Sequence, residues 1–349
     1  MKPVLGVFKG EGVGPEVTSV ALDVLEQMGL PLEVQFGGPI GNEADQGDGR
    51  TLSPQAETFC QAVFARRGAV LAGPGGGRFV YDCRKRFGLN YKLNPIKTLP
   101  GLSPVRSVDI LVVRENLSGL YQCQETKPSP DVECRFSTNA ESVAVAADVA
   151  AAEAARRTGR LTLVRKEHGT PETSRLWQRC AQKSAAERDV ELEVLDVDYA
   201  CYQLLRAPEQ FDVILTSNCF GDILADLGGH LTGSRGMTFG ASFGLSNEAI
   251  YQTNHGAAWG LAGKDVANPV GHLLSLAWML ERTYQNPSAA FDLRTALNSV
   301  YEEGFRTADL LEEGVWNLVR PVRSKLVGTK EFGEVLVSRL AQRKLRQTV

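Results

Sequence analysis

One stretch of the sequence decides the fold: Phe211-Asp212-Val213-Ile214-Leu215-Thr216 and, one residue later, Asn218-Cys219-Phe220-Gly221-Asp222-Ile223-Leu224-Ala225-Asp226. The first part is apolar and β-branched, which predicts a buried strand. The second part predicts a helix that begins where the strand ends. Because strands that run directly into helices are typical of α/β proteins, we predict an α/β fold.

Two aspartates in this stretch, Asp222 and Asp226, are four residues apart. On a helix both carboxylates lie on one face, one turn from each other, where like charges repel. Two interpretations stay open from these residues alone. The aspartates can be the acidic first turn that favours a helix dipole, or they can be hard oxygen ligands of Mg²⁺ or Mn²⁺.

The composition of the chain limits its class. With 349 residues, 43% hydrophobic and 23% charged, it is long enough for two domains with large cores. The net charge of −3 gives no reason to expect nucleic acid or a membrane surface as partner. No apolar run reaches the roughly 18 residues of a membrane span, and the start reads as a strand, not as a signal peptide. The seven cysteines form no C-x-x-C pair, so we expect reduced thiols in a cytoplasmic protein.

Further segments continue the alternation of strands and helices. Polar residues at 121–138 suggest an extended arm, 240–263 reads as a loop, and 290–349 reads as two or three amphipathic helices. The other strands are predicted at 4–8, 69–72, 108–113, 161–164 and 191–197, and the other helices at 16–28, 144–157 and 270–280.

Charged residues follow several of these strands, at the edge where α/β proteins place their sites: Arg114, Lys166 and Asp198. The glycines of 10–15 do not form the dinucleotide fingerprint G-x-G-x-x-G, and a tight turn explains them as well. The basic residues of 78–95 are predicted to line a solvated helix face.

Together these motifs resemble the metal-dependent β-decarboxylating dehydrogenases, the isocitrate and isopropylmalate dehydrogenase family. The resemblance spans nearly the whole chain. It is carried by Gly10-Glu11-Gly12-Val13-Gly14-Pro15-Glu16, Arg114-Glu115-Asn116 with Gly119-Leu120-Tyr121, Phe220-Gly221-Asp222-Ile223-Leu224 with Asp226, and His255-Gly256 with Ala262-Gly263-Lys264 and Ala267-Asn268-Pro269.

The resemblance implies a fold of two α/β domains with a cleft between them, which is not a Rossmann fold. Residues 1–99 and 251–349 would form the larger, cofactor-binding domain. Residues 100–250 would form the smaller domain, with the arm and the contact of a homodimer. Each active site would lie in the cleft and would be completed by the second subunit.

Site residues follow from the same resemblance. Asp222 and Asp226 match two metal ligands, and Asp198 matches the ligand given by the partner, for Mg²⁺ or Mn²⁺. Lys166 matches the lysine that takes the hydroxyl proton, a role that requires a lowered pKa. Tyr121 matches the tyrosine that protonates the enolate carbon. The residues expected at the substrate carboxylates are Arg84, Arg114 and, where the family has a third arginine, Asn94.

The expected cofactor is NAD, with NADP as the alternative. Its contacts would be Val13, His255, Gly256, Ala257, Ala258, Gly260 and Asn268. Gly260 and Leu261 replace the acid or the lysine-tyrosine pair that selects the nucleotide in the family. His168 replaces an asparagine, and Gln252-Thr253 replaces Glu-Pro. The segment 77–83 is more polar than an isopropyl pocket should be.

These departures predict an enzyme that oxidatively decarboxylates an atypical 3-substituted malate, an anionic small molecule. Two alternatives are a metal-dependent dehydrogenase that does not decarboxylate and a non-catalytic regulatory subunit. The second alternative is the weaker one, because the matched aspartates and Lys166 are all present.

Overall fold

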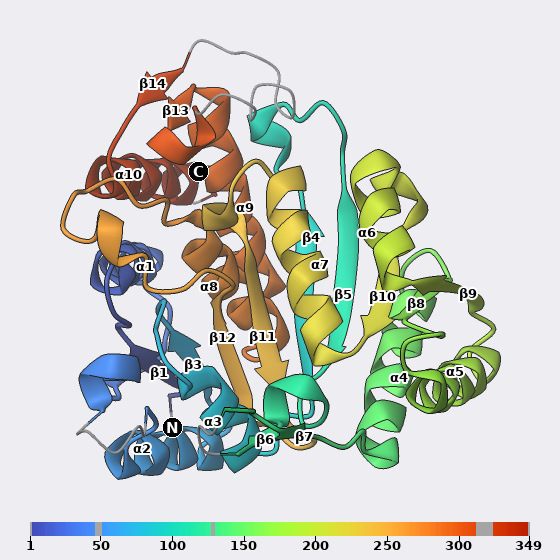
Figure 1. Cartoon of the computed structure of the whole chain (residues 1–349). Coiled ribbons are helices and arrows are strands. Elements are labelled where there is room, and N and C mark those ends of the chain that lie inside the picture. Colours follow the sequence, from blue (N-terminus) through green and yellow to red (C-terminus); the bar gives the residue numbers. More distant parts are fainter. Residues whose placement is uncertain (1, 46–50, 127–129, 312–323, 348–349) are drawn as a thin grey trace.

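A single ten-stranded sheet organises the chain (Figure 1). The structure, a computed structural model, describes residues 2–45, 51–126, 130–311 and 324–347. The strand order is β2-β1-β3-β12-β11-β4-β5-β10-β8-β9. Both outer groups of strands are parallel, and β11 and β4 join them through antiparallel pairs. The predicted α/β class is confirmed.

The sheet strands are short and largely buried. They are β1 (Val4–Phe8), β2 (Glu33–Phe36), β3 (Ala69–Ala72), β4 (Tyr91–Lys97), β5 (Asp109–Glu115), β8 (Arg160–Arg165), β9 (Glu191–Asp196), β10 (Val213–Thr216), β11 (Phe239–Phe243) and β12 (Ala249–Thr253). Two small pairs stand apart from this sheet: β6 (Gln124–Glu125) with β7 (Cys134–Arg135), and β13 (Phe305–Arg306) with β14 (Lys325–Leu326).

Helices cover both faces of the sheet (Figure 1). They are α1 (Gly14–Met28), α2 (Pro54–Ala65), α3 (Phe79–Arg86), α4 (Ala140–Ala155), α5 (Pro171–Ala186), α6 (Val197–Arg206), α7 (Asn218–Leu231), α8 (Val270–Arg282), α9 (Pro287–Glu302) and α10 (Thr329–Gln347). The decisive stretch of the sequence forms β10 and α7 as predicted. Ser217 precedes α7 with an extended backbone, which lets the helix begin directly after the strand.

Apolar side chains alternate between the two faces, as the two-residue period of a strand requires. On β5, Leu111 and Val113 join the main core, which also contains side chains from α1, α4, α5, α8, α9 and α10. Ile110 and Val112 point to the other face. That face carries two separate apolar clusters, one under α2 and α3 and one under α6 and α7. The polar side chains of the site come from strands β4 and β5 on this second face.

Two sequence predictions are wrong. The loop predicted at 240–263 is wrong for residues 240–253, because β11 and β12 form an antiparallel pair there, whereas 254–263 contain only the short 3-10 helix Trp259–Leu261. Residues 78–95 are not a solvated helix face: α3 ends at Arg86, the chain continues as the central strand β4, and Arg84 and Lys92 are buried. Part of the predicted arm, 127–129, and part of the C-terminal region, 312–323, lie outside the described residues.

The sheet passes through both expected domains without interruption. The expected boundary at 99/100 follows β4, and the boundary at 250/251 falls within β12. The division into two domains therefore stays a prediction. All seven cysteines are free thiols. No helix in the described parts of the chain is long and apolar enough to cross a membrane.

Candidate active site

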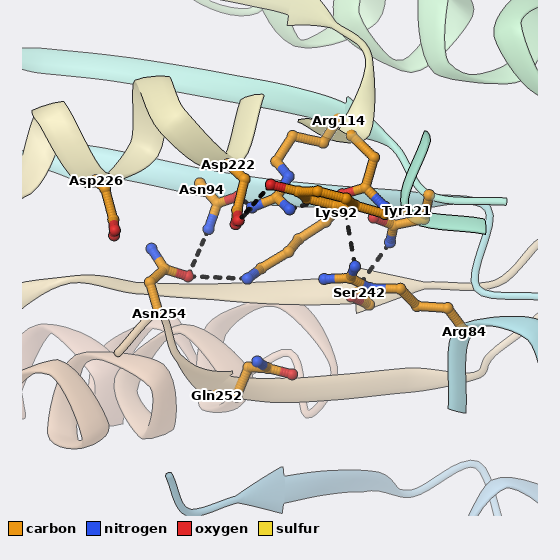
Figure 2. A network of polar contacts seen from close by, with 12 residues as sticks. Arg84, Lys92, Asn94, Arg114, Tyr121, Asp222, Asp226, Ser242, Gln252 and Asn254 are labelled. Atoms are coloured by element: carbon orange, nitrogen blue, oxygen red, sulfur yellow. Dashed lines mark hydrogen bonds and ion pairs between the residues drawn. The ribbon is translucent and has the colours of Figure 1, made fainter. Parts of the chain in front are cut away.

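Three buried cations lie together on the second face of the sheet (Figure 2). Arg84 comes from α3, Lys92 from β4 and Arg114 from the end of β5, and their exposed fractions are 3%, 3% and 1%. The register of the antiparallel pair β4–β5 places Lys92 directly opposite Arg114. Residues opposite each other in a sheet project to the same face, so the backbone itself brings these charges together.

The two guanidinium groups meet at one side-chain amide. The Oδ1 atom of Asn218, the first residue of α7, accepts from Arg114 Nη2 at 2.6 Å and from Arg84 Nη1 at 3.5 Å. The Nε atoms of both arginines are buried without a partner in the described residues. Burial and the neighbouring Arg114 lower the pKa of Arg84 to about 10. This arrangement is short of negative charge, which an anionic ligand would supply.

Asp222 is the acidic group next to these cations. Its Oδ1 lies 2.9 Å from Arg114 Nη1, and its Oδ2 accepts from the Tyr121 hydroxyl at 3.3 Å. Burial by itself would raise the pKa of Asp222, but Arg114, Lys92 and Arg84 outweigh it and hold that pKa below its usual value. Burial and the charge of Asp222 raise the pKa of Tyr121. Tyr121 is therefore held as a neutral phenol that can donate a proton.

Gly221 explains how Arg114 can pack against α7. A Cβ at this position would lie 2.3 Å from Cγ of Arg114, so a side chain there would displace the arginine. Strand β10 and the start of α7 thus place Asn218, Gly221 and Asp222 on the helix turn that covers Arg114.

Asp226 lies one turn further along α7 and forms an ion pair with Arg235 at 2.9 Å. The carboxylates of Asp222 and Asp226 are each about half exposed, and both have arginine partners. In the described part of the chain, no three acidic, histidine or cysteine side chains come close enough to hold a metal ion together. One chain therefore supplies two of the three expected metal ligands at one place.

The third expected ligand, Asp198, lies in a second group with the expected proton acceptor. Lys166 Nζ is 2.6 Å from Asp198 Oδ1 and 3.6 Å from Asp196 Oδ2. The side chains of Lys166 and Asp198 are 38% and 70% exposed. The hydrogen bond with Asp198 raises the pKa of Lys166. The expected role needs a lowered pKa, so the isolated chain does not provide the environment that Lys166 requires as a base.

The expected cofactor residues come from two loops that touch through their backbones. Val13 N–H donates to the Ala257 carbonyl at 2.8 Å, and a Cβ at Gly12 would lie 2.0 Å from the same oxygen. His255 Nδ1 lies 3.0 Å from the Gly256 carbonyl, and burial lowers the pKa of this histidine.

A cavity of about 180 Å³ opens beside this contact, between the glycine loop 73–77 and residues 252–256. Asn268 is buried and donates to Asp309 at 3.0 Å. Ala258 adopts a left-handed backbone with φ of 46°, and Gly260 is open to solvent. A cavity lined by the glycine-rich turn 73–77 fits part of a dinucleotide, since glycines without a Cβ let a ligand approach the backbone.

Three residues of the site were missed in the sequence: Lys92, Asn218 and Asn254. Figure 2 shows Lys92 and Asn94 both pointing toward Asn254, whose Oδ1 accepts from Lys92 Nζ at 2.9 Å and from Asn94 Nδ2 at 2.7 Å. Had 91–97 been read as a strand, its two-residue period would have placed Lys92 beside Asn94. No sequence signal marks Asn218 or Asn254, because an amide at the end of a strand is common.

Comparisons with known proteins identify the family of the chain. Residues 4–336 match the family model described as isocitrate/isopropylmalate dehydrogenase. The chain belongs to the isocitrate/isopropylmalate dehydrogenase family. The resemblance seen in the motifs is thereby confirmed, and so is the α/β fold of this family.

Members of this dehydrogenase family match the chain over nearly its full length. The 3-isopropylmalate dehydrogenase of Thermosynechococcus vestitus is 36% identical, with 97% of this chain and 98% of that protein covered. That of Clostridium pasteurianum is 34% identical over 96% of this chain and 99% of its own. The crystal structure of isocitrate dehydrogenase from Methylococcus capsulatus superimposes with a TM-score of 0.86 at 28% identity and covers 98% of this chain and 100% of that one. These relatives of the chain are all dehydrogenases, which places the chain among the oxidoreductases.

Proposed function

We propose that the protein is an NAD-dependent enzyme that, with Mg²⁺ or Mn²⁺, oxidatively decarboxylates a 3-substituted malate. The observation that supports this most is the group of buried Arg84 and Arg114 against Asp222, with the Tyr121 hydroxyl hydrogen-bonded to the same carboxylate. Cations bind the substrate carboxylates, and a neutral phenol held beside them can protonate a carbon once carbon dioxide has left.

The donor set of α7 fits a hard divalent cation. Asp222 and Asp226 offer carboxylate oxygens one turn apart, which Mg²⁺ and Mn²⁺ prefer. When bound, such an ion makes the substrate hydroxyl more acidic and stabilises negative charge on its oxygen. Arg114 and Arg235, which now pair with the two aspartates, would be freed for other partners.

We also propose that two subunits share each site. Lys166 and Asp198 would reach the Asp222 group of a partner subunit, where the cations near Asp222 lower the pKa of Lys166. Neighbouring helices α6 and α7 support this, because they expose the large side chains of Tyr199, Tyr202 and Ile223 by 50%, 56% and 48%. Apolar side chains gathered on adjacent helices favour a subunit contact there.

NAD is favoured over NADP because Gly260 and Leu261 carry no group that could bind the extra phosphate of NADP. Neither side chain can bind a 2′-phosphate, and the cavity beside Gly256 can take the nicotinamide end. Lys166 would accept the hydroxyl proton, the hydride would go to the nicotinamide, and Tyr121 would return a proton to the carbon that loses the carboxylate.

A second function is favoured by Asn94. Both polar atoms of its side chain are engaged, by Asn254 and by Arg114, so it offers little to a substrate carboxylate. A dehydrogenase that stops after hydride transfer would need fewer carboxylate contacts.

A substrate panel tests both functions. Malate, tartrate, isocitrate and 3-isopropylmalate are each supplied with NAD or NADP and with Mg²⁺ or Mn²⁺. Equal amounts of carbon dioxide and NADH support decarboxylation. NADH without carbon dioxide supports the second function, and no reduction of either nucleotide by any 2-hydroxy acid contradicts both.

A further inference from the structure

Lys92 occupies an unfavourable place for a lysine. It is 3% exposed on the central strand β4 and lies opposite Arg114 on the same face of the sheet. Like charges directly opposite each other destabilise a sheet, and a buried charge without a counter-ion is costly. A side chain kept in such a position calls for an explanation beyond packing.

The partners of Lys92 in the protein do not neutralise it. Its Nζ donates to the neutral Oδ1 of Asn254 at 2.9 Å, and no carboxylate oxygen of the described residues lies within ion-pair distance. Asp222 and Asp226 attract it from farther away, but each is already paired with an arginine. An ammonium group has three donors, so two of them are free for a ligand.

The surroundings select an anion as that ligand. Arg84 and Arg114 both lie near Lys92 and repel it, and all three side chains are buried. Against these three positive charges stands the nearby Asp222, which is itself proposed to hold a cation. A ligand with one or more carboxylates would neutralise the group.

Resting on the proposed function, we propose that Lys92 is the third substrate-binding cation of the site and binds a carboxylate of the 2-hydroxy acid together with Arg84 and Arg114. It takes the place of the arginine that is absent at position 94. On a strand, positions 92 and 94 share a face, so the charge stays in the site when it moves by two residues.

The neighbours of Lys92 fit this role. Asn254 accepts hydrogen bonds from both Lys92 and Asn94 and so fixes the direction of the lysine (Figure 2). Gly240 on β11 leaves the room that both side chains use, since a Cβ there would lie 2.4 Å from Asn94 Nδ2 and 3.0 Å from Lys92 Cε. Lysine binds as a point charge and not as a planar fork, so it accepts a carboxylate from more directions than an arginine does.

Two variants test the inference: Lys92→Met removes the charge, and Lys92→Gln also removes it but keeps a donor for Asn254. The control is Lys97→Met, on the same strand, where the lysine is 59% exposed and pairs with Asp109. We expect KM for the active 2-hydroxy acid to rise about 10- to 100-fold in both Lys92 variants, the effect of losing a charge-assisted hydrogen bond. KM for NAD should stay within about twofold, and the control should match wild type.

A second measurement does not depend on turnover. Malate, isocitrate and 3-isopropylmalate, with Mg²⁺, are each titrated while the thermal unfolding of the full chain is followed. We expect at least one of them to raise the melting temperature of the wild type and of Lys97→Met, but much less that of the Lys92 variants.

The outcomes separate this inference from the proposed function. Stabilisation that depends on Lys92, in an enzyme that oxidises none of the acids, supports the inference and contradicts the function. An unchanged KM in both Lys92 variants overturns the inference while the function stands. If none of the three acids stabilises the wild type, Lys92 is not a carboxylate-binding group.

Discussion

The chain carries two groups of candidate site residues that differ in their surroundings. The first group, named the buried group after its two buried arginines Arg84 and Arg114, also contains the partly exposed Tyr121 and Asp222. It joins α3, β5 and α7 in a region with excess positive charge. The exposed group, Lys166, Asp196 and Asp198, follows β8 and β9 and is an ordinary ion pair at the surface. Exposed ion pairs contribute little to stability. Under the proposed function, the buried group is already assembled within one chain, whereas the exposed group needs a partner subunit to complete it.

Removal of divalent metal should change turnover more than any substitution in either group. If Asp222 and Asp226 serve a metal, excess EDTA should abolish turnover, and Mg²⁺ or Mn²⁺ should restore it. The measurement is NADH formation before and after chelation, with circular dichroism as the control for folding. Full turnover in EDTA would mean that the arginines of the buried group, and not a metal, neutralise the substrate.

Substitution of Lys166 should cause the second-largest loss of turnover. Lys166→Met should reduce kcat by at least about a hundredfold, since a lost general base costs this much or more. KM for the 2-hydroxy acid should change little, because the buried group still binds the carboxylates. Lys183→Met, an exposed lysine on α5, is the matched control. Near-normal turnover in Lys166→Met would remove the exposed group from the reaction.

Mixing two inactive variants should restore one of the two sites in each heterodimer that forms. Asp198→Asn damages the exposed group and Asp222→Asn the buried one, so each homodimer should be nearly inactive. In a heterodimer of two-fold symmetry, one shared site carries both substitutions and the other carries neither. Activity after co-refolding is compared with that of each variant refolded alone. If verified heterodimers stay as inactive as their parents, the two groups never meet across a subunit contact.

A change at Gly260, in the segment 254–263 that is expected to bind the cofactor, should have the smallest effect on turnover. It should leave the residues of both groups in place. Gly260→Asp should raise the preference for NAD over NADP several-fold, because the carboxylate can bind ribose hydroxyls and repels a 2′-phosphate. No atom lies within 4 Å of a Cβ at Gly260, so the substitution should not disturb folding. The ratio of kcat/KM values for the two nucleotides measures the effect. An unchanged ratio would place nucleotide selection elsewhere, and a large fall in kcat would link this loop to the chemistry.

The sequence was informative where local patterns and spacing agree. The apolar run before α7 and the four-residue spacing of Asp222 and Asp226 predicted both the strand and the shared helix face. Strand β11 was missed because Gly240, Ala241 and Ser242 have low strand propensity and form a strand only through their pairing with β12 and β4.

For the basic segment 78–92, the sequence did not predict which side chains are buried. Several positive charges between 78 and 92 look like a solvated surface, and in most proteins they would be one. Lys92 is buried because β4 becomes a central strand, which depends on paired residues from 12 (Lys97 with Asp109) to 152 positions (Tyr91 with Phe243) apart in the chain. For the same reason, the charged partners of Lys166 and of Asp222 follow only from the fold.

The shared face of positions 92, 94 and 96 has a consequence for how such a site can evolve. Lys92 and Asn94 belong to its polar part, whereas Ile96 packs into the apolar cluster under α6 and α7. Relocating a charge between 92 and 94 changes neither the register of the sheet nor the apolar packing. A lineage can thus alter which acid it accepts through two substitutions on one strand, without any new loop or insertion.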